Sequence, residues 1–304
     1  MDVYYEGVNI TDDVLVKSCT VHDTCGGRAD GLEIVFEDAA KWFSWGPKED
    51  DEIEVENLGY QSGAMYVNTV TPEGGKYRIL ATSLRCAARK REYRSYNNKT
   101  LGEIMSLCAL NTGMDSRLFG LDAALPIRYI EQNGESAARF LHRLMTLEGA
   151  VLKCVQGRYT GIGVTWAQER RAGLTFALYA DRADTVYVRK GGALQSLAIS
   201  MPGQRVSATD TDIKNGMSAV KCGLPVSDAP QAGRWARGLL INHNRKNEIL
   251  TLDTVYNPAM TAMTRVDVTG GTDADGEWLV DHAEHDMIEE TTRTTLCRCV
   301  TTVI

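Results

Sequence analysis

The segment 281–286 (DHAEHD) contains the side chains best suited to metal binding or proton transfer, namely His282, His285 and Asp286. Side chains alternate between the two faces of a β-strand, so His282 and Asp286 would share one face and His285 would point to the other. Two histidines three residues apart fit neither a strand nor the i, i+4 pair of a metal-binding helix. We therefore expect a solvated or interface surface here and predict no metal ligands, with a metal site as the alternative.

Two glycine-containing segments resemble binding loops only superficially. In the segment 210–216 (DTDIKNG), which resembles a calcium loop, Lys214 takes the place of a third ligand and Lys221 stands where the closing glutamate should be. The segment 157–163 lacks the Lys-Ser/Thr pair of a phosphate-binding loop and does not open a helix. We predict no calcium, phosphate or other cofactor site at either place.

Sequence motifs of hydrolases are missing as well. The chain contains no G-x-S-x-G, no H-E-x-x-H and no supported Cys–His pair, and we expect a surface or interface position for His142. The two carboxylates of a glycosidase are brought together only by the tertiary fold, so a glycan- or peptidoglycan-cleaving activity stays open as an alternative. The leading prediction is that no residue of this chain is catalytic.

The charge balance limits the possible partners. Lys and Arg total 33 against 40 Asp and Glu, giving a formal net charge of -7, whereas proteins that grip nucleic acid need a basic surface. One dense basic run is present, comprising Arg85, Arg89, Lys90, Arg91 and Arg94. We expect it to be a solvated strand end or loop, with an anionic or protein partner as the alternative.

The sequence predicts folding in the cytoplasm. No apolar run approaches the ~18–20 residues that span a bilayer, and the N-terminus lacks the basic and apolar parts of a signal peptide. The eight cysteines should then be reduced and mostly buried as small apolar residues. Cys297 and Cys299 would share one face of a strand but lie too far apart to bond, and the absence of any C-x-x-C pair argues against structural zinc.

The overall pattern predicts an α+β fold that is mostly β. Residues 1–94 should form a first antiparallel β-barrel, residues 95–172 a small α/β module, and residues 173–304 a second β-barrel with one helix at about 229–243. Short strands separated by Gly and Pro turns carry this prediction. The expected strands cover residues 3–5, 8–10, 14–22, 31–36, 51–56, 60–70, 76–83, 185–189, 194–201, 217–224, 248–255, 265–268, 277–288 and 293–303.

Two helices are expected in the central module. Thr100 and Glu103 form a capping box, and an apolar stripe follows, after which Gly113 can end the helix. That stripe consists of Leu101, Ile104, Leu107, Cys108 and Leu110. The second helix lies within 129–161, with Gly149 as a left-handed cap and a hairpin turning at Gln156-Gly157. Its apolar positions are Ala137, Phe140, Leu141, Leu144 and Leu147.

Taken together, these segments resemble the late control D family, the baseplate hub proteins of contractile phage tails and related injection machines. The segment 99–104 (KTLGEI) resembles the family's T-L-x-[DE]-I helix start. The segment 129–150 resembles its Q-x-x-E-S-x-x-x-F-L-x-R-L-x-x-x-x-G block and is the most specific match. Weaker resemblances lie in the first barrel, at 31–36 and 51–56, and in the closing hairpin, at 276–282 and 291–299.

The resemblance implies a homotrimer that ends the tail tube. Each subunit would supply two tube-like barrels, so that three subunits match the six-fold tube above and the three-fold spike below. The implied partners are the tail tube protein and the central spike protein, with tape measure and baseplate wedge proteins as further candidates. No specific nucleic-acid binding and no membrane insertion are expected. The protein would assemble in the host bacterial cytoplasm and end in the tail of a phage, a tailocin or another contractile particle.

Two physical arguments agree with this interpretation as a ring-forming hub. Exposed strand edges could pair around a ring, and an acidic channel would repel DNA phosphates and let the genome slide. The chain is shorter than many such hubs and shows no appended hydrolase domain, so no enzymatic activity is expected. A cell-surface carbohydrate-binding module is a further alternative and would need an exposed aromatic platform. Trp42 and Trp45 could supply one, although core or subunit-contact positions are expected for them.

Overall fold

The computed structural model describes residues 1–38, 46–178, 185–270 and 272–304. Its fold is α+β and mostly β, as predicted. The segment that carries Trp42 and Trp45 lies outside the described residues, so the proposed aromatic platform stays a prediction.

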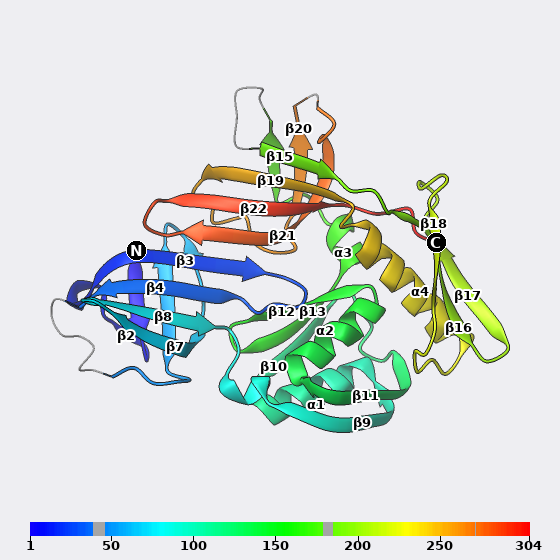
Figure 1. Ribbon diagram of the computed structural model, residues 1–304, viewed down its shortest axis with the longest axis horizontal. Helices are drawn as coiled ribbons and strands as arrows, with labels where there is room; N and C mark the ends of the chain where they lie inside the picture. Colours follow the sequence, from blue (N-terminus) through cyan, green and yellow to red (C-terminus); the bar gives the residue numbers. More distant parts are fainter. Residues whose placement is uncertain (39–45, 179–184, 271) are drawn as a thin grey trace.

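The N-terminal region forms an antiparallel sheet at one end of the molecule (Figure 1). Its residues alternate inward and outward, and Leu32, Ile34 and Phe36 reach one apolar core together with Ile53 and Val55. The strands are β1 (Asp2–Tyr5), β2 (Val8–Asn9), β3 (Leu15–Thr24), β4 (Gly31–Glu37), β5 (Glu52–Asn57), β6 (Tyr60–Gln61), β7 (Met65–Glu73) and β8 (Lys76–Thr82). The hairpin between β7 and β8 turns at two residues, Gly74 and Gly75, both with positive φ. The turn is therefore shorter than residues 71–75, which separate the two expected strands.

The C-terminal region forms a second set of strands, closed by the predicted long hairpin. They are β14 (Leu174–Ala177), β15 (Thr185–Arg189), β19 (Glu248–Val255), β20 (Arg265–Thr269), β21 (Gly276–Asp286) and β22 (Thr291–Arg298). Their core surrounds Trp278, with Leu250, Val266, Val280 and Leu296 against it. The sequence pattern located most of these strands because each is a short β-branched or apolar run.

The two strand-rich regions share one continuous sheet. Strand β21 pairs antiparallel with β3, from His282 opposite Thr24 to Asp286 opposite Thr20. Strands β3 and β21 run side by side in Figure 1, and the sheet continues from β15 at one edge to β2 at the other. We call this β3–β21 pairing the seam.

The central module contains more strands than the sequence pattern indicated. Besides the predicted helices it has β9 (Arg91–Thr100), β10 (Asp115–Phe119), β11 (Pro126–Ser136), β12 (Ala150–Val155), β13 (Arg158–Gly163) and the short helix α3 (Val164–Glu169). The polar residues 96–99 belong to β9, which pairs along its length with β11. This ribbon exposes most of its side chains, so it lacks the apolar alternation by which a strand is recognised.

Helices α1 (Leu101–Thr112) and α2 (Ala137–Leu147) form at the predicted positions. The capping box of Thr100 and Glu103 is present, and Gly113 ends α1 in the left-handed conformation. The predicted apolar stripe of α1 was partly wrong: Leu107 and Leu110 are 37% and 77% exposed. Met105 and Ala109 are buried in their place, because α1 packs on its neighbours through a face rotated from the predicted one.

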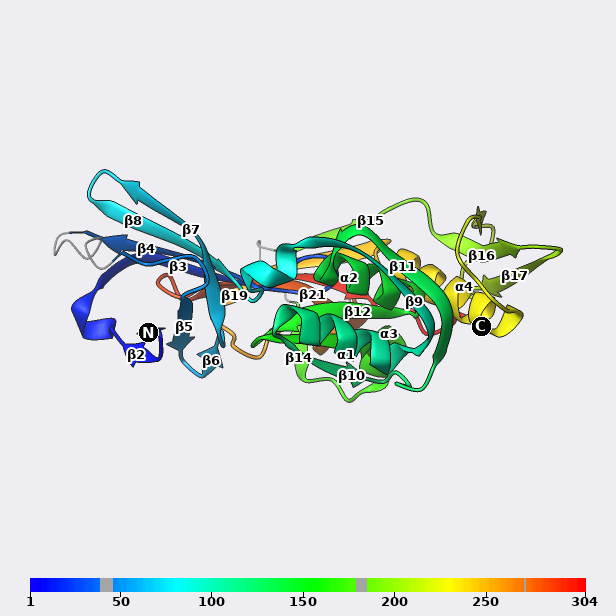
Figure 2. The same ribbon diagram turned by 90° about the horizontal axis from the view of Figure 1, so that it is seen from below.

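The expected helix near 229–243 is α4 (Ala229–Asn244), and it packs against the central module. Strands β16 (Leu194–Met201), β17 (Gln204–Thr209) and β18 (Met217–Lys221) form a small sheet beside it, opposite the N-terminal end of the molecule (Figure 2). The buried side of α4, including Trp235 and Leu240, joins the same apolar core as Phe140 and Leu144 of α2. This core therefore combines residues that precede β14 and β15 in the chain with residues that follow them.

Helices α2 and α4 approach so closely that only glycine fits at their crossing. A Cβ atom on Gly238 would overlap the backbone nitrogen of Gly149 and the carbonyl oxygen of Leu147. These two atoms belong to the backbone and cannot rotate away. The close contact thus depends on a residue without a side chain.

Replacing Gly238 by Ala is expected to lower the free energy of unfolding by about 1–3 kcal/mol through this overlap. Gly233→Ala in the same helix is the matched control, because its Cβ would lie 3.7 Å from the Val206 side chain, an ordinary contact. That control should be neutral or stabilising by up to roughly 1 kcal/mol, since Ala favours a helix over Gly. Urea unfolding of the two variants measures both effects, and equal stability of the two would contradict the crossing contact.

Candidate functional sites

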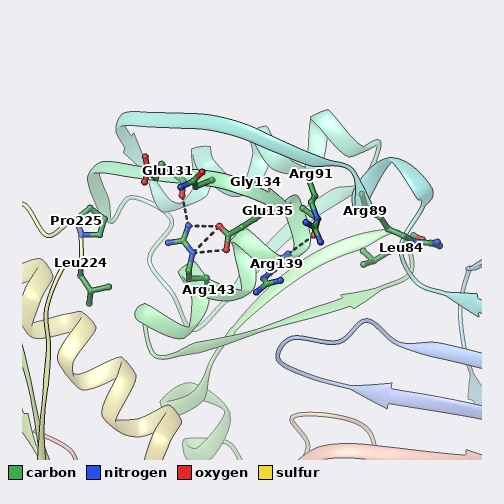
Figure 3. A pocket seen from close by; sticks show the side chains of 14 residues that line it. Leu84, Arg89, Arg91, Glu131, Gly134, Glu135, Arg139, Arg143, Leu224 and Pro225 are labelled. Carbon is green, nitrogen blue, oxygen red and sulfur yellow. Dashed lines mark hydrogen bonds and ion pairs between the residues drawn. The ribbon is translucent and has the colours of Figure 1, made fainter.

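An arginine-lined pocket of about 680 Å³ opens beside the central module (Figure 3). Its walls come from the short 3₁₀ turn η3 (Cys86–Arg89), from β9, β11 and α2, and from the loop before α4. The charged side chains that line it are Arg89, Arg91, Glu131, Glu135, Arg139 and Arg143. The predicted basic run therefore contributes two of its members, Arg89 and Arg91.

Arg143 is fixed inside this arginine pocket. Its Nη2 donates to Glu135 Oε2 at 2.8 Å and to the Glu131 carbonyl at 2.6 Å, and its Nε lies 3.3 Å from both Glu135 oxygens. Its guanidinium carbon lies 5.4 Å from the Phe140 ring centroid. These bonds tie α2 to β11 and leave Arg143 little freedom to change partners.

Arg91 and Arg139 are the cations of the pocket that can receive a ligand. Within the described ranges neither forms an ion pair with a carboxylate, and both point toward the pocket in Figure 3. Guanidinium groups bind carboxylate and phosphate oxygens through paired N–H donors. The pocket is thus suited chemically to an anionic group.

The two glutamates of the pocket do not have the arrangement of a glycosidase. Glu131 and Glu135 both come from β11, whereas acid and base residues must face each other across the scissile bond. Both Glu135 oxygens are also engaged by Arg143, and Glu131 accepts from the Tyr129 hydroxyl at 3.0 Å. The geometry of this pocket gives no support to the glycan-cleaving alternative.

The remaining members of the basic run lie outside the pocket. The Arg85 guanidinium carbon lies 4.2 Å from the Tyr66 ring centroid, and Arg94 Nε forms a 2.7 Å ion pair with Glu92. A solvated strand end or loop was expected for this run; Arg85 precedes η3, and Arg94 lies within β9.

The segment 281–286 lies on β21, with His285 on the opposite face from His282 and Asp286, as predicted. His285 is fully buried, its ring centroid lies 4.5 Å from that of Tyr60, and its Nδ1 lies 3.1 Å from the Thr292 hydroxyl. Burial lowers the pKa of His285 below its ordinary value. Asp286 accepts from two backbone amides of the following turn.

His282 instead meets two residues that sequence reasoning did not connect with it. His22 of β3 and Glu284 of β21 place their ligand atoms within 4.8 Å of one another and of His282. His22 was not predicted as a possible metal ligand, because the pairing of β3 with β21 cannot be deduced from either strand alone. We call these three residues the seam triad.

The other predicted positions have structural surroundings. Asp210 is buried and accepts from Asn244 Nδ2 at 2.8 Å and from the Thr302 hydroxyl at 2.7 Å, so it anchors the C-terminal segment. Gln156 and Gly157 both have positive φ and form the predicted hairpin turn. His142 is half-buried against Gly27, and burial lowers its pKa.

A buried ion cluster joins the central module to the strand-rich regions. Lys153 Nζ of β12 donates to Asp23 Oδ1 at 2.6 Å and to Asp30 Oδ2 at 2.9 Å. Asp23 Oδ1 also accepts from the backbone amide of Ala262 at 2.8 Å. Burial raises the pKa of Asp30 to about 7; Lys153 opposes this shift, and the neighbouring Asp23 adds to it. One lysine thus holds two buried carboxylates.

Most of the cysteines are buried, as the composition indicated. All eight cysteines are free, and Cys19, Cys25, Cys108, Cys154 and Cys297 are buried, as predicted for small apolar residues. In the described part of the chain, no helix has the length and apolar character needed to cross a membrane.

Comparison with known proteins shows where this fold occurs. No protein-family model matches the sequence, and no curated protein matches it either. The structure is similar to a 43 kDa tail protein of prophage MuSo2 from Shewanella oneidensis, with a TM-score of 0.74 and 15% identity over 100% of this chain and 99% of that one. A tail protein from Neisseria meningitidis MC58 gives 0.77 and 10% identity over 98% and 95%.

A third similar structure comes from a bacterial secretion machine. It is a component of the type VI secretion system of E. coli, described as structurally similar to the T4 bacteriophage tail proteins gp27 and gp5. The TM-score is 0.56 at 13% identity, covering 98% of this chain and 76% of that one. The chain therefore has the fold of phage tail proteins, and this fold is also found in a type VI secretion component.

Proposed function

We propose that this protein is a structural hub of a contractile tail, as the resemblance to the late control D family implies. The observation that carries the proposal is the similarity to two phage tail proteins over nearly the whole length of both partners. Three copies would form a ring between the six-fold tail tube and the three-fold spike. Assembly would take place in the host cytoplasm, and the finished ring would belong to the tail particle.

The sheet architecture supports this role. Two strand-rich regions within one continuous sheet would supply two tube-like units per chain, so three copies would supply six. Within the described residues the path of the sheet ends at β15 and at β2, which leaves edges for pairing with neighbours. Closed ring symmetry would satisfy these edges and limit open-ended association.

One face of this sheet is suited to line a channel for DNA. The strand registers place charged side chains of both signs on it: Arg78 pairs with Glu33 at 3.4 Å, Arg293 pairs with Asp253 at 3.5 Å, and Glu37 lies opposite Lys76. Glu284 and Asp286 would make the part of this face at the seam acidic. An acidic lining repels phosphates, so DNA would pass without adhering. A net basic lining in the assembled ring would count against this part of the proposal.

The mass of the purified protein in solution tests the proposal. Light scattering after gel filtration should give about 100 kDa, three times the 33.5 kDa of one chain, and a larger mass when the spike protein is added. Val186 on the edge strand β15 is 55% exposed, and Val186→Lys should lower the mass to that of a monomer. Val220→Lys on β18, 47% exposed and in a separate sheet, is the control and should keep the mass.

A stable monomer that binds neither tube nor spike would overturn the proposal. The enzymatic alternative is tested in parallel by a zymogram against peptidoglycan, in which no lytic band is expected. A band that disappears in Glu131→Gln would favour the enzyme instead.

A further inference from the structure

The seam triad brings together two imidazoles and one carboxylate. Glu284 lies directly opposite His22 in the β3–β21 register, and His282 lies two residues before Glu284 in β21, opposite Thr24. The two imidazole rings are stacked, with centroids 5.7 Å apart and planes inclined by 11°. His22 Nδ1 lies 3.8 Å from Glu284 Oε2.

A β-bulge in strand β21 produces this arrangement. The register shifts between Val280 and His282, so one extra residue enters β21 at that point. Bulges re-aim the side chains that follow them. As a result His282 and Glu284 share a face with His22, while Ala283 and His285 continue the buried face.

Two imidazoles and a carboxylate are the donor set of many zinc sites that keep a position open for a further ligand. Metal–ligand bonds of about 2.0–2.2 Å would place the donor atoms roughly 3.3 Å apart in a tetrahedral site. The triad's donor atoms already lie within 4.8 Å of one another, and all three side chains are half-exposed and can rotate.

We propose that His22, His282 and Glu284 bind a divalent transition metal of the imidazole-preferring kind, with Zn²⁺ as the probe. The metal would bridge β3 and β21 across the seam. These two strands are more than 250 residues apart in the chain, as are Cys25 and Asp281, which are in contact beside the seam. The metal would therefore stabilise the junction between the two strand-rich regions. This inference does not depend on the proposed tail function.

Titration of the chelator-treated full chain with Zn²⁺ tests the site by calorimetry and thermal unfolding. All proteins compared carry Cys222→Ser, because Cys222 is exposed and could bind the metal itself. One Zn²⁺ per chain is expected, with a rise in Tm on the order of 5 °C at a free Zn²⁺ concentration about 100-fold above Kd. Mg²⁺, which prefers oxygen ligands, should cause no shift.

Variants distinguish this site from any other metal-binding group. His282→Asn and Glu284→Gln should each weaken Zn²⁺ binding at least roughly tenfold and remove the Tm shift, as loss of a ligand does. His243→Asn is the control, because the exposed His243 ring contacts Gly192 and is not a member of the triad, and it should bind like the parent. Glu284→Gln keeps both imidazoles and serves if a histidine variant does not fold.

Two outcomes would overturn the inference. Absence of Zn²⁺ binding by the folded parent chain would show that the triad is only a surface ion pair with stacked rings. Equal Zn²⁺ affinity of the parent, His282→Asn and Glu284→Gln would place the metal elsewhere.

Discussion

Lys153→Met is expected to lower the free energy of unfolding by about 3–5 kcal/mol, since it leaves buried carboxylates without their cation. The side chains of Lys153, Asp23 and Asp30 are only 11%, 6% and 3% exposed, so water cannot replace the lost partner. Because the cluster contacts β3, β12 and the loop at Ala262, the whole molecule should unfold at lower urea concentration. Lys214→Met, at an exposed position, is the control and should stay within about 0.5 kcal/mol.

A second variant separates charge from packing in this cluster. If unpaired charge causes the loss, Lys153→Met should cost clearly less in an Asp30→Asn background, because one of the two carboxylates has been removed. Strictly additive costs would argue that the methylene groups of Lys153, and not its ammonium, are what matters.

Phe140→Ala is expected to cost about 3–5 kcal/mol through the cavity it leaves in the central core. The Phe140 ring is fully buried and stacks on Tyr96, with centroids 5.2 Å apart and planes inclined by 10°. The loss should appear in urea unfolding together with a weaker Tyr96 near-ultraviolet signal. Phe140→Leu keeps most of the volume and should cost less than about 1.5 kcal/mol.

Leu110→Ala provides the comparison on the neighbouring helix. Leu110 is 77% exposed, so its removal should change stability by no more than about 0.5 kcal/mol. A loss as large as that of Phe140→Ala would mean that the Leu110 side of α1 is packed in solution, for instance against another subunit.

The elements that were predicted best are those determined by a few residues adjacent in the chain. The capping box of Thr100 and Glu103 and the Gln156-Gly157 turn each depend on a few neighbouring residues, so their signals can be read from the chain itself. Strand β9 was missed because its polar residues face water and the strand, paired with β11, covers little core.

The candidate sites were harder to predict because they depend on distant pairing. His282 was recognised as a possible ligand, yet its neighbour His22 lies on a strand that no local signal connects with β21. Lys153 was not predicted as a site residue, because a lysine within a strand is usually exposed, whereas both faces of β12 are buried and the lysine is paired inside. Arg139 and Arg143 were not predicted as site residues either, because only the packing of η3 and the loop before α4 makes them part of a pocket.

The seam also has a consequence for how the chain is made. Ribosomes add about 5–20 residues per second, so β3 emerges at least roughly ten seconds before its partner β21. During that interval the N-terminal strands can fold, but one side of β3 has no hydrogen-bonding partner from its own chain. Nascent chains on one messenger could pair through this exposed edge, so slowed translation should increase aggregation, and co-expressed chaperones should reduce it.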